Sequence, residues 1–165
     1  MSSLATIIIV EDIARSRTLY EGILGQKVVA DFGIYNVGFE GGFAMYRRSF
    51  FQELTGRESV LDKSNSFVLY LEVDKIEELE NVIRENRFEF LHETREQPWK
   101  QRILRFYDYD NHIVEIAEKM DAVSRRLFDE NHSVEEISKM TGLPIEEVQK
   151  QIALCRDCSS GGECP

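Results

Sequence analysis

The sequence of 165 residues lacks a long apolar run, and it contains only three cysteines, three prolines and three histidines. The longest apolar run, around residues 7–10, is far too short to cross a bilayer. No charged region precedes this run as in a secretion signal. The sequence therefore predicts a protein without a membrane span, for which a cytoplasmic location is the default expectation.

Positive charge is also scarce, because 20 Lys and Arg residues face 30 Asp and Glu residues, and the formal net charge is -10. This balance argues against broad binding to a nucleic-acid backbone, which is itself negative. The glycines at positions 38, 41 and 42 fit neither of the common nucleotide-binding patterns. No serine or cysteine nucleophile lies in a recognisable turn motif. We therefore predict no catalytic residue of these classes.

All three cysteines, Cys155, Cys158 and Cys164, lie in the last eleven residues. A CxxC pair followed by a third cysteine is compatible with zinc binding or with a disulfide. A closed zinc site, however, needs a fourth ligand from elsewhere in the chain or from a second chain. The simpler interpretation is a flexible tail over residues 155–165 without a structural role.

What the chain does contain is one order of elements that occurs twice. Apolar runs at 6–10, 28–32, 35–39 and 43–46 predict strands, with a helix over 13–24 after the first of them. The second half repeats the order, with strands at 67–73 and 88–91, a helix over 75–86 and a hairpin within 97–116. Two tandem βαβββ modules predict an α+β fold with an eight-stranded curved mixed sheet, because neither module alone can cover its own sheet.

The hairpin carries one carboxylate, Glu115, among apolar residues. Strand alternation places Glu115 on one face with Ile113 and Ala117, while Val114 and Ile116 take the other face. If the second set packs on the helices, Glu115 points to the concave side of the sheet. A carboxylate there must be paired or hydrogen-bonded. Two interpretations stay open, namely an arginine-paired structural residue and a ligand contact.

Arginines and aromatic residues lie on the neighbouring predicted strands. Arg47 and Arg48 end the fourth strand, and Arg102 and Arg105 lie in the seventh. Cations gathered on strands of an acidic protein indicate either an anion site or internal ion pairs. Aromatic side chains nearby can cap a pocket. The predicted ligand-binding residues are Arg47, Tyr70, Trp99, Arg102 and Glu115.

Several motifs occur in the order typical of one protein superfamily. They are VEDIARS at 10–16, LEVDKI at 71–76, QPW at 97–99 and YDYDNHIVE at 107–115. Over residues 4–119 the chain resembles the vicinal oxygen chelate superfamily, which has the fold of glyoxalases, bleomycin-resistance proteins and extradiol dioxygenases. This resemblance reinforces the expected fold. It leaves the chemistry open, because one fold hosts many functions.

The resemblance implies a divalent metal held by His or Glu on the first, fourth, fifth and eighth strands. Those positions fall on Ala5, on Met45 or Arg47, on Val68 and on Glu115. Only Glu115 has a side chain that suits such a metal, and one carboxylate does not make a site. We therefore expect no metal and no cofactor.

Two functions of different classes remain open for the sheet domain. The first is metal-independent binding of a small molecule, in the manner of bleomycin-resistance proteins, with an anionic or aromatic ligand. The second is a divergent metal-dependent lyase or dioxygenase-like enzyme. A homodimer is compatible with either function.

The C-terminal region, residues 120–154, predicts three short helices. The first covers 122–129, a capping box at 133–136 opens the second, and the third begins at Pro144. The arrangement is similar to a helix-turn-helix unit. Glu146 and Glu147, however, occupy the start of the third helix, where carboxylates repel phosphate. We expect a structural or protein-contacting extension, with a ligand-sensing regulator as the weaker alternative.

Overall fold

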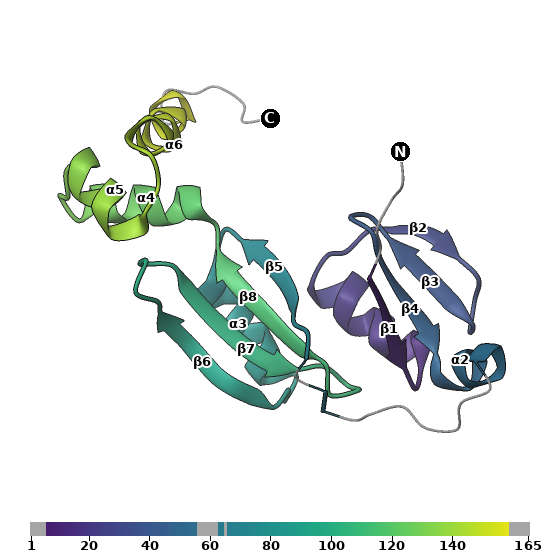
Figure 1. Ribbon diagram of the computed structural model, residues 1–165. Helices are drawn as coiled ribbons and strands as arrows, with labels where there is room; N and C mark the ends of the chain where they lie inside the picture. The colour runs from purple at the N-terminus through teal and green to yellow at the C-terminus, as the bar shows by residue number, and fades with distance from the viewer. Residues whose placement is uncertain (1–5, 56–62, 65, 159–165) are drawn as a thin grey trace. The chain divides into compact units, whose positions relative to one another are not determined.

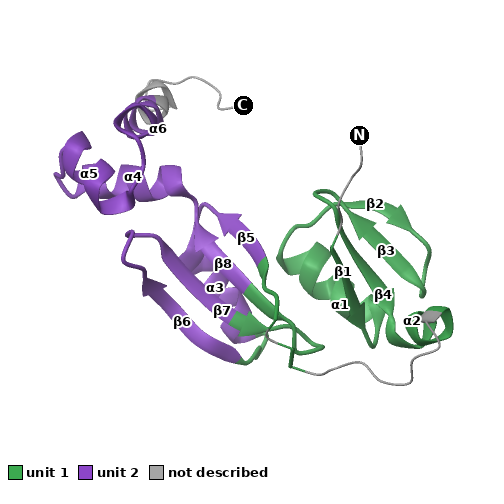
Figure 2. Ribbon diagram, in the orientation of Figure 1, with its two compact units in different colours: residues 1–69, 86–89, 106–114 green, residues 70–85, 90–105, 115–165 purple. Residues whose placement is uncertain are grey.

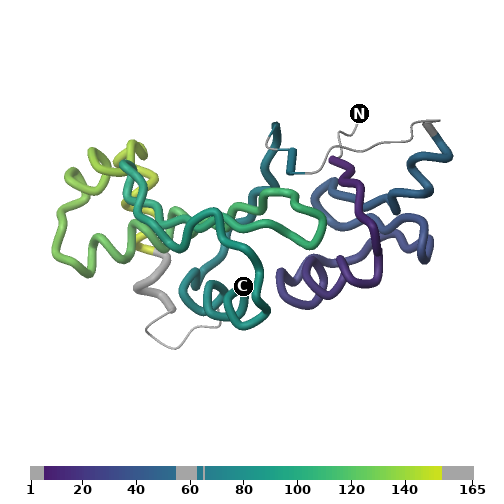
Figure 3. Tube along the Cα trace, turned by 90° about the horizontal axis from the view of Figure 1, so that it is seen from below, coloured from purple at the N-terminus to yellow at the C-terminus, as the bar shows by residue number. Residues whose placement is uncertain are grey.

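The computed structural model describes residues 6–55, 63–64 and 66–158 (Figure 1). The chain divides into two compact units (Figure 2). The first unit comprises residues 1–69, 86–89 and 106–114, and the second comprises residues 70–85, 90–105 and 115–165. The succession of the two modules and the C-terminal helices can be followed along the trace in Figure 3.

The first module begins with β1 (Thr6–Val10), α1 (Ile13–Arg17) and the π-helix η1 (Thr18–Ile23). It continues with β2 (Val28–Asp31), β3 (Asn36–Phe39), β4 (Phe43–Arg47) and α2 (Arg48–Thr55). The strands form one sheet in the order β1-β4-β3-β2, in which β1 runs parallel to β4 and the other pairs are antiparallel.

The helical segment after β1 follows the predicted range but changes type within it. Asp12 caps α1 by accepting a hydrogen bond from the Arg15 N–H. The Leu24 N–H then donates to the Leu19 carbonyl at 2.8 Å, which gives η1 its wider spacing. Leu19 and Tyr20 of η1 are buried, so this turn holds the helix against the core.

The helix α2 was not predicted, because Arg48 was assigned to the end of the fourth strand. The strand ends at Arg47, and Arg48 begins the helix. Phe50 of α2 contacts the rings of Tyr35 and Tyr46, with ring centres 5.4 and 5.7 Å apart. These aromatic contacts favour a helix that folds back over the end of β4.

The second sheet contains β5 (Leu69–Val73), β6 (Phe90–Glu96), β7 (Arg102–Tyr107) and β8 (Ile113–Glu118) in the order β5-β8-β7-β6. The helix α3 (Ile76–Glu85) lies against one face of this sheet (Figure 1). The α+β class is confirmed, with the eight strands arranged as two four-stranded mixed sheets. Strand β6 extends beyond the predicted range of 88–91 and includes His92.

The turn between β7 and β8 belongs to the first unit, where two aspartates hold it in place. Asp108 accepts hydrogen bonds from the Tyr20 hydroxyl at 2.7 Å and from Nδ1 of His112 at 2.8 Å. Asp110 accepts one from the Glu11 N–H at 2.8 Å. Burial raises the pKa of Asp110, and the nearby Asp108 carboxylate raises it further against the effect of that N–H.

Three C-terminal helices follow β8 within the second unit. They are α4 (Met120–Asp129), α5 (Val134–Thr141) and α6 (Ile145–Cys158). The predicted capping box at Ser133 and Glu136 is confirmed, and Gly142 ends α5 in the left-handed conformation, with φ 76°. The helix α6 continues beyond the predicted end and includes positions 155 and 158, whereas Cys164 lies outside the described residues.

The three helices share a core of their own. This core consists of the buried residues Val123, Leu127, Ile137, Val148 and Ile152. Met120, Val134 and Leu143 are partly buried and pack against it. In the part of the chain that the structure covers, no helix is both long enough and apolar enough to span a membrane.

Candidate functional site

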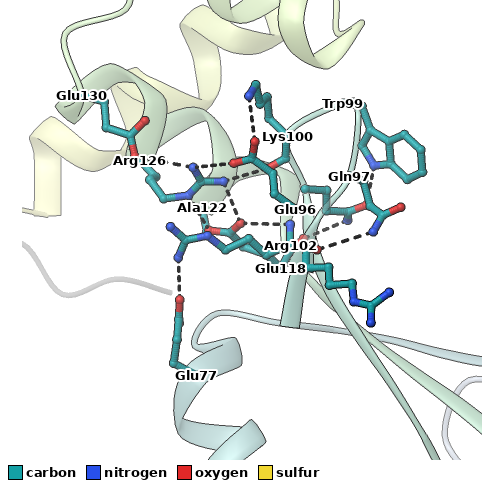
Figure 4. Close-up of polar contacts among 12 residues, drawn as sticks. Glu77, Glu96, Gln97, Trp99, Lys100, Arg102, Glu118, Ala122, Arg126 and Glu130 are labelled. Carbon is teal, nitrogen blue, oxygen red and sulfur yellow. Dashed lines mark hydrogen bonds and ion pairs between the residues drawn. The ribbon is translucent and has the colours of Figure 1, made fainter. Parts of the chain in front are cut away.

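The two arginines of β7 lie on opposite faces of the second sheet. Arg102 forms an ion pair with Glu77 of α3, with 2.5 Å between Nη1 and Oε1 (Figure 4). Residues 102, 104 and 106 therefore face α3. By alternation Arg105 lies on the other face together with residue 101. We call this second face, which carries Tyr70, His92, Gln101, Arg105 and Glu115, the polar face.

Glu115 belongs to the polar face because the register of the hairpin pairs it with Arg105. Val114 and Ile116 are 1% and 0% exposed, and the Glu115 side chain is 16% exposed. The Asp108 N–H donates to the His112 carbonyl, and the same antiparallel register places Arg105 opposite Glu115. The carboxylate and the guanidinium therefore meet across the two strands.

Arg105 connects Glu115 to His92. Its Nε and Nη2 each lie 2.5 Å from Oε2 of Glu115, and its Nη1 lies 2.8 Å from Nε2 of His92. Because arginine only donates, Nε2 of His92 must accept, so the ring proton is on Nδ1. That nitrogen donates to the Glu93 carbonyl at 2.8 Å. The result is a row of a histidine, a guanidinium and a carboxylate that are joined by hydrogen bonds.

Two half-exposed aromatic rings, Tyr70 and Trp99, are connected by one buried amide. Gln101, which is 6% exposed, accepts from Nε1 of Trp99 at 2.9 Å and donates to the Tyr70 hydroxyl at 3.2 Å. The Tyr70 hydroxyl in turn donates to Glu72 at 2.7 Å. Desolvation of the hydroxyl and this bond to Glu72 raise the pKa of Tyr70, so the phenol stays protonated near neutral pH.

The two rings offer apolar surface to a ligand. Tyr70 is 53% and Trp99 is 43% exposed, although both have their polar atoms hydrogen-bonded. Exposed rings that are held in place supply contact area at low entropic cost. The polar face can therefore offer stacking surfaces and a guanidinium together.

The residues at the metal positions implied by the superfamily do not fit a divalent ion. Met45 is buried, Arg47 is itself a cation, Val68 has no donor atom and Ala5 lies outside the described residues. Glu115, the remaining position, is already bound by Arg105. Among the described residues no group of three or more His, Cys, Asp or Glu side chains is placed to hold a metal.

The structure brings together only some of the residues proposed from the sequence. Tyr70 and Glu115 belong to the polar face, and Trp99 lies in the adjoining turn and donates to Gln101 of that face. Arg102 instead faces α3. Arg47 belongs to the first unit, where it lines a pocket of about 540 Å³ with residues that include Glu11, Asp12, Arg17 and Asp31. The role of each residue in ligand binding stays a prediction.

Three residues of the polar face were not among the sequence-based site residues, namely His92, Gln101 and Arg105. Arg105 could have been found from the hairpin register, which follows from the length of the Asp/Asn-rich turn. Gln101 carried no such signal, because its importance comes from contacts with residues 70 and 118 that are distant in sequence.

Comparison with known proteins identifies the sheet domain. The family model described as a glyoxalase-like domain matches residues 4–121. A protein of unknown function from Agrobacterium tumefaciens is 34% identical, with a TM-score of 0.63, over 72% of this chain and 94% of that chain. A hypothetical protein from S. aureus is 22% identical, with a TM-score of 0.61 and the same coverage of both chains.

A third solved structure, a glyoxalase-related enzyme from Fulvimarina pelagi, is 20% identical with a TM-score of 0.60, over 72% of this chain and 88% of that chain. No curated protein matches the sequence. The resemblance to the vicinal oxygen chelate superfamily is confirmed, and the helices α4 to α6 lie almost entirely beyond the matched residues. The chain belongs to the family of glyoxalase-like domains.

Proposed function

We propose that this protein binds a small anionic aromatic molecule on the polar face of its second sheet, without a metal ion. The observation that carries the proposal is the pair of Arg105 and Glu115. Glu115 is the one carboxylate at the superfamily metal positions, and its positive partner is the Arg105 guanidinium where relatives would have a metal ion. An arginine can meet a ligand's negative group at the place where relatives with metal would use the ion.

Arg105 keeps capacity for a ligand beyond its partners in the protein. Three of its five N–H groups contact Glu115 or His92. Within the described part of the chain, one N–H on Nη1 and one on Nη2 have no further acceptor, which suits the two oxygens of a carboxylate or phosphate. The half-exposed rings of Tyr70 and Trp99 would then contact the aromatic part of the ligand.

Replacing Arg105 by methionine should weaken binding of an aromatic carboxylate by about 1.5 to 3 kcal/mol, because a charge-assisted hydrogen bond is lost. Suitable probes are 1-naphthoate and its neutral analogue 1-naphthamide, compared by titration calorimetry in the presence of a chelator. Wild-type protein should prefer 1-naphthoate.

Arg102→Met is the matched control, since it removes an arginine of the same strand from the opposite face. It should leave the affinity unchanged. The proposal fails if the neutral probe binds as tightly as the anion. It also fails if Arg102→Met weakens binding while Arg105→Met does not.

A further inference from the structure

Arg126 of α4 connects the C-terminal helices to the turn that bears Trp99 (Figure 4). Its side chain is only 16% exposed. Its Nη2 donates to the Lys100 carbonyl at 2.7 Å and to Oε2 of Glu118 at 3.1 Å. Its Nη1 lies 3.6 Å from carboxylate oxygens of both Glu96 and Glu130.

Residues 97–101 form a turn that is closed by two backbone hydrogen bonds, and we call it the Trp99 turn. Arg126 contacts this turn and the strand before it. The Gln97 N–H donates to the Gln101 carbonyl at 2.8 Å, and the Lys100 N–H donates to the Gln97 carbonyl at 2.9 Å. Lys100 has a positive φ of 69° and forms an ion pair with Glu96 at 2.7 Å. Arg126 therefore contacts Glu96 at the end of β6 and Lys100 within the turn, and it stabilises the turn on both sides of Trp99.

A second path leads from Arg126 to the aromatic rings. The Glu118 carboxylate accepts a hydrogen bond from the Arg126 guanidinium. The backbone carbonyl of Glu118 accepts another from Nε2 of Gln101 at 2.9 Å. Gln101 is the amide that orients Trp99 and Tyr70. Displacement of Arg126 would therefore change the orientation of the two rings in two ways, through the turn and through Gln101.

We propose that Arg126 is a positioning residue through which the C-terminal helices set the orientation of Trp99, so that ligand affinity depends on the docking of α4. The effect on affinity rests on the function proposed above. The positioning itself does not. Because the three helices have their own apolar core, α4 can present Arg126 from a rigid support.

Arg126→Met should shift the emission of Trp99 to longer wavelength and increase its quenching by acrylamide, because the turn loses its hold. Trp99 is the only tryptophan of the chain, so tryptophan emission, excited selectively over that of tyrosine, reports this site alone. Arg125→Met is the matched control, since Arg125 forms its ion pair with Asp121 of the same helix. Its emission should equal that of the wild type.

Arg126→Lys separates positioning from simple loss of folding. A lysine keeps the charge but cannot bond the Lys100 carbonyl and the Glu118 carboxylate in the same fork. The emission wavelength of the Arg126→Lys variant should lie between those of the wild type and Arg126→Met. Its helical circular dichroism should be unchanged. Wild-type emission and quenching in a folded Arg126→Lys variant and in a folded Arg126→Met variant would overturn the proposal. If Arg126→Met does not fold, wild-type values in Arg126→Lys alone would do so.

The ligand arm uses 1-naphthoate with the same variants. Affinity should fall several-fold in Arg126→Met and stay unchanged in Arg125→Met. Equal affinity of Arg126→Met and wild type would refute the dependence on α4. If no aromatic carboxylate binds even to the wild type, the proposed function fails, whereas the fluorescence shift still decides whether Arg126 positions Trp99.

Discussion

Replacing Asp108 by alanine should lower the free energy of unfolding of the first unit by about 3 kcal/mol. The Asp108 side chain is 1% exposed and accepts from the Tyr20 hydroxyl and from Nδ1 of His112. It also accepts from the backbone N–H groups of Asp110 and His112 at 2.9 and 2.8 Å. Alanine would leave several of these donors without an acceptor in a buried place.

Urea unfolding monitored by circular dichroism measures this loss. Asp74→Ala is the control, because that carboxylate is exposed and forms a surface ion pair with Lys119 at 3.0 Å. It should cost less than about 1 kcal/mol. A loss below about 1 kcal/mol for Asp108→Ala as well would show that the turn is not held through this carboxylate.

Replacing Ile137 by alanine should destabilise the C-terminal helices by about 2 to 5 kcal/mol, because the residue is fully buried in their core. Amide hydrogen exchange of α4 to α6 is the suitable measurement, since it reports local opening separately from unfolding of the sheets. Exchange in these helices should become faster, while β5 to β8 should change little.

Ile145→Ala is the matched control for this experiment. Ile145 is 40% exposed at the start of α6, so its truncation should have a small effect. Equal effects of the two substitutions would show that the helical core does not hold the three helices together.

The order of elements was predictable from the sequence because the apolar periodicity of each module is strong. In β8, Val114 and Ile116 are buried and Glu115 lies on the other face, as alternation requires. The helix α2 was missed because no glycine or proline separates it from β4, so the pattern gave no boundary.

The side-chain partners of the site were less predictable. Arg102 and Arg105 are three positions apart on one strand and must face opposite sides. The sequence pattern alone did not predict which arginine would form an ion pair with Glu77 of α3 and which with Glu115. The contact of Arg126 with the Lys100 carbonyl joins residues 26 positions apart, a pairing that no local periodicity encodes.

The most direct test of ligand binding on the polar face is a nitrogen-15 NMR titration of the full chain with 1-naphthoate in excess chelator. Our account predicts that the Trp99 Nε1–H and Arg105 Nε–H resonances shift, while the Arg102 Nε–H resonance does not. If Trp99 and Arg105 stay unchanged while other residues shift, or if shifts appear only after a divalent metal is added in place of the chelator, the account is contradicted.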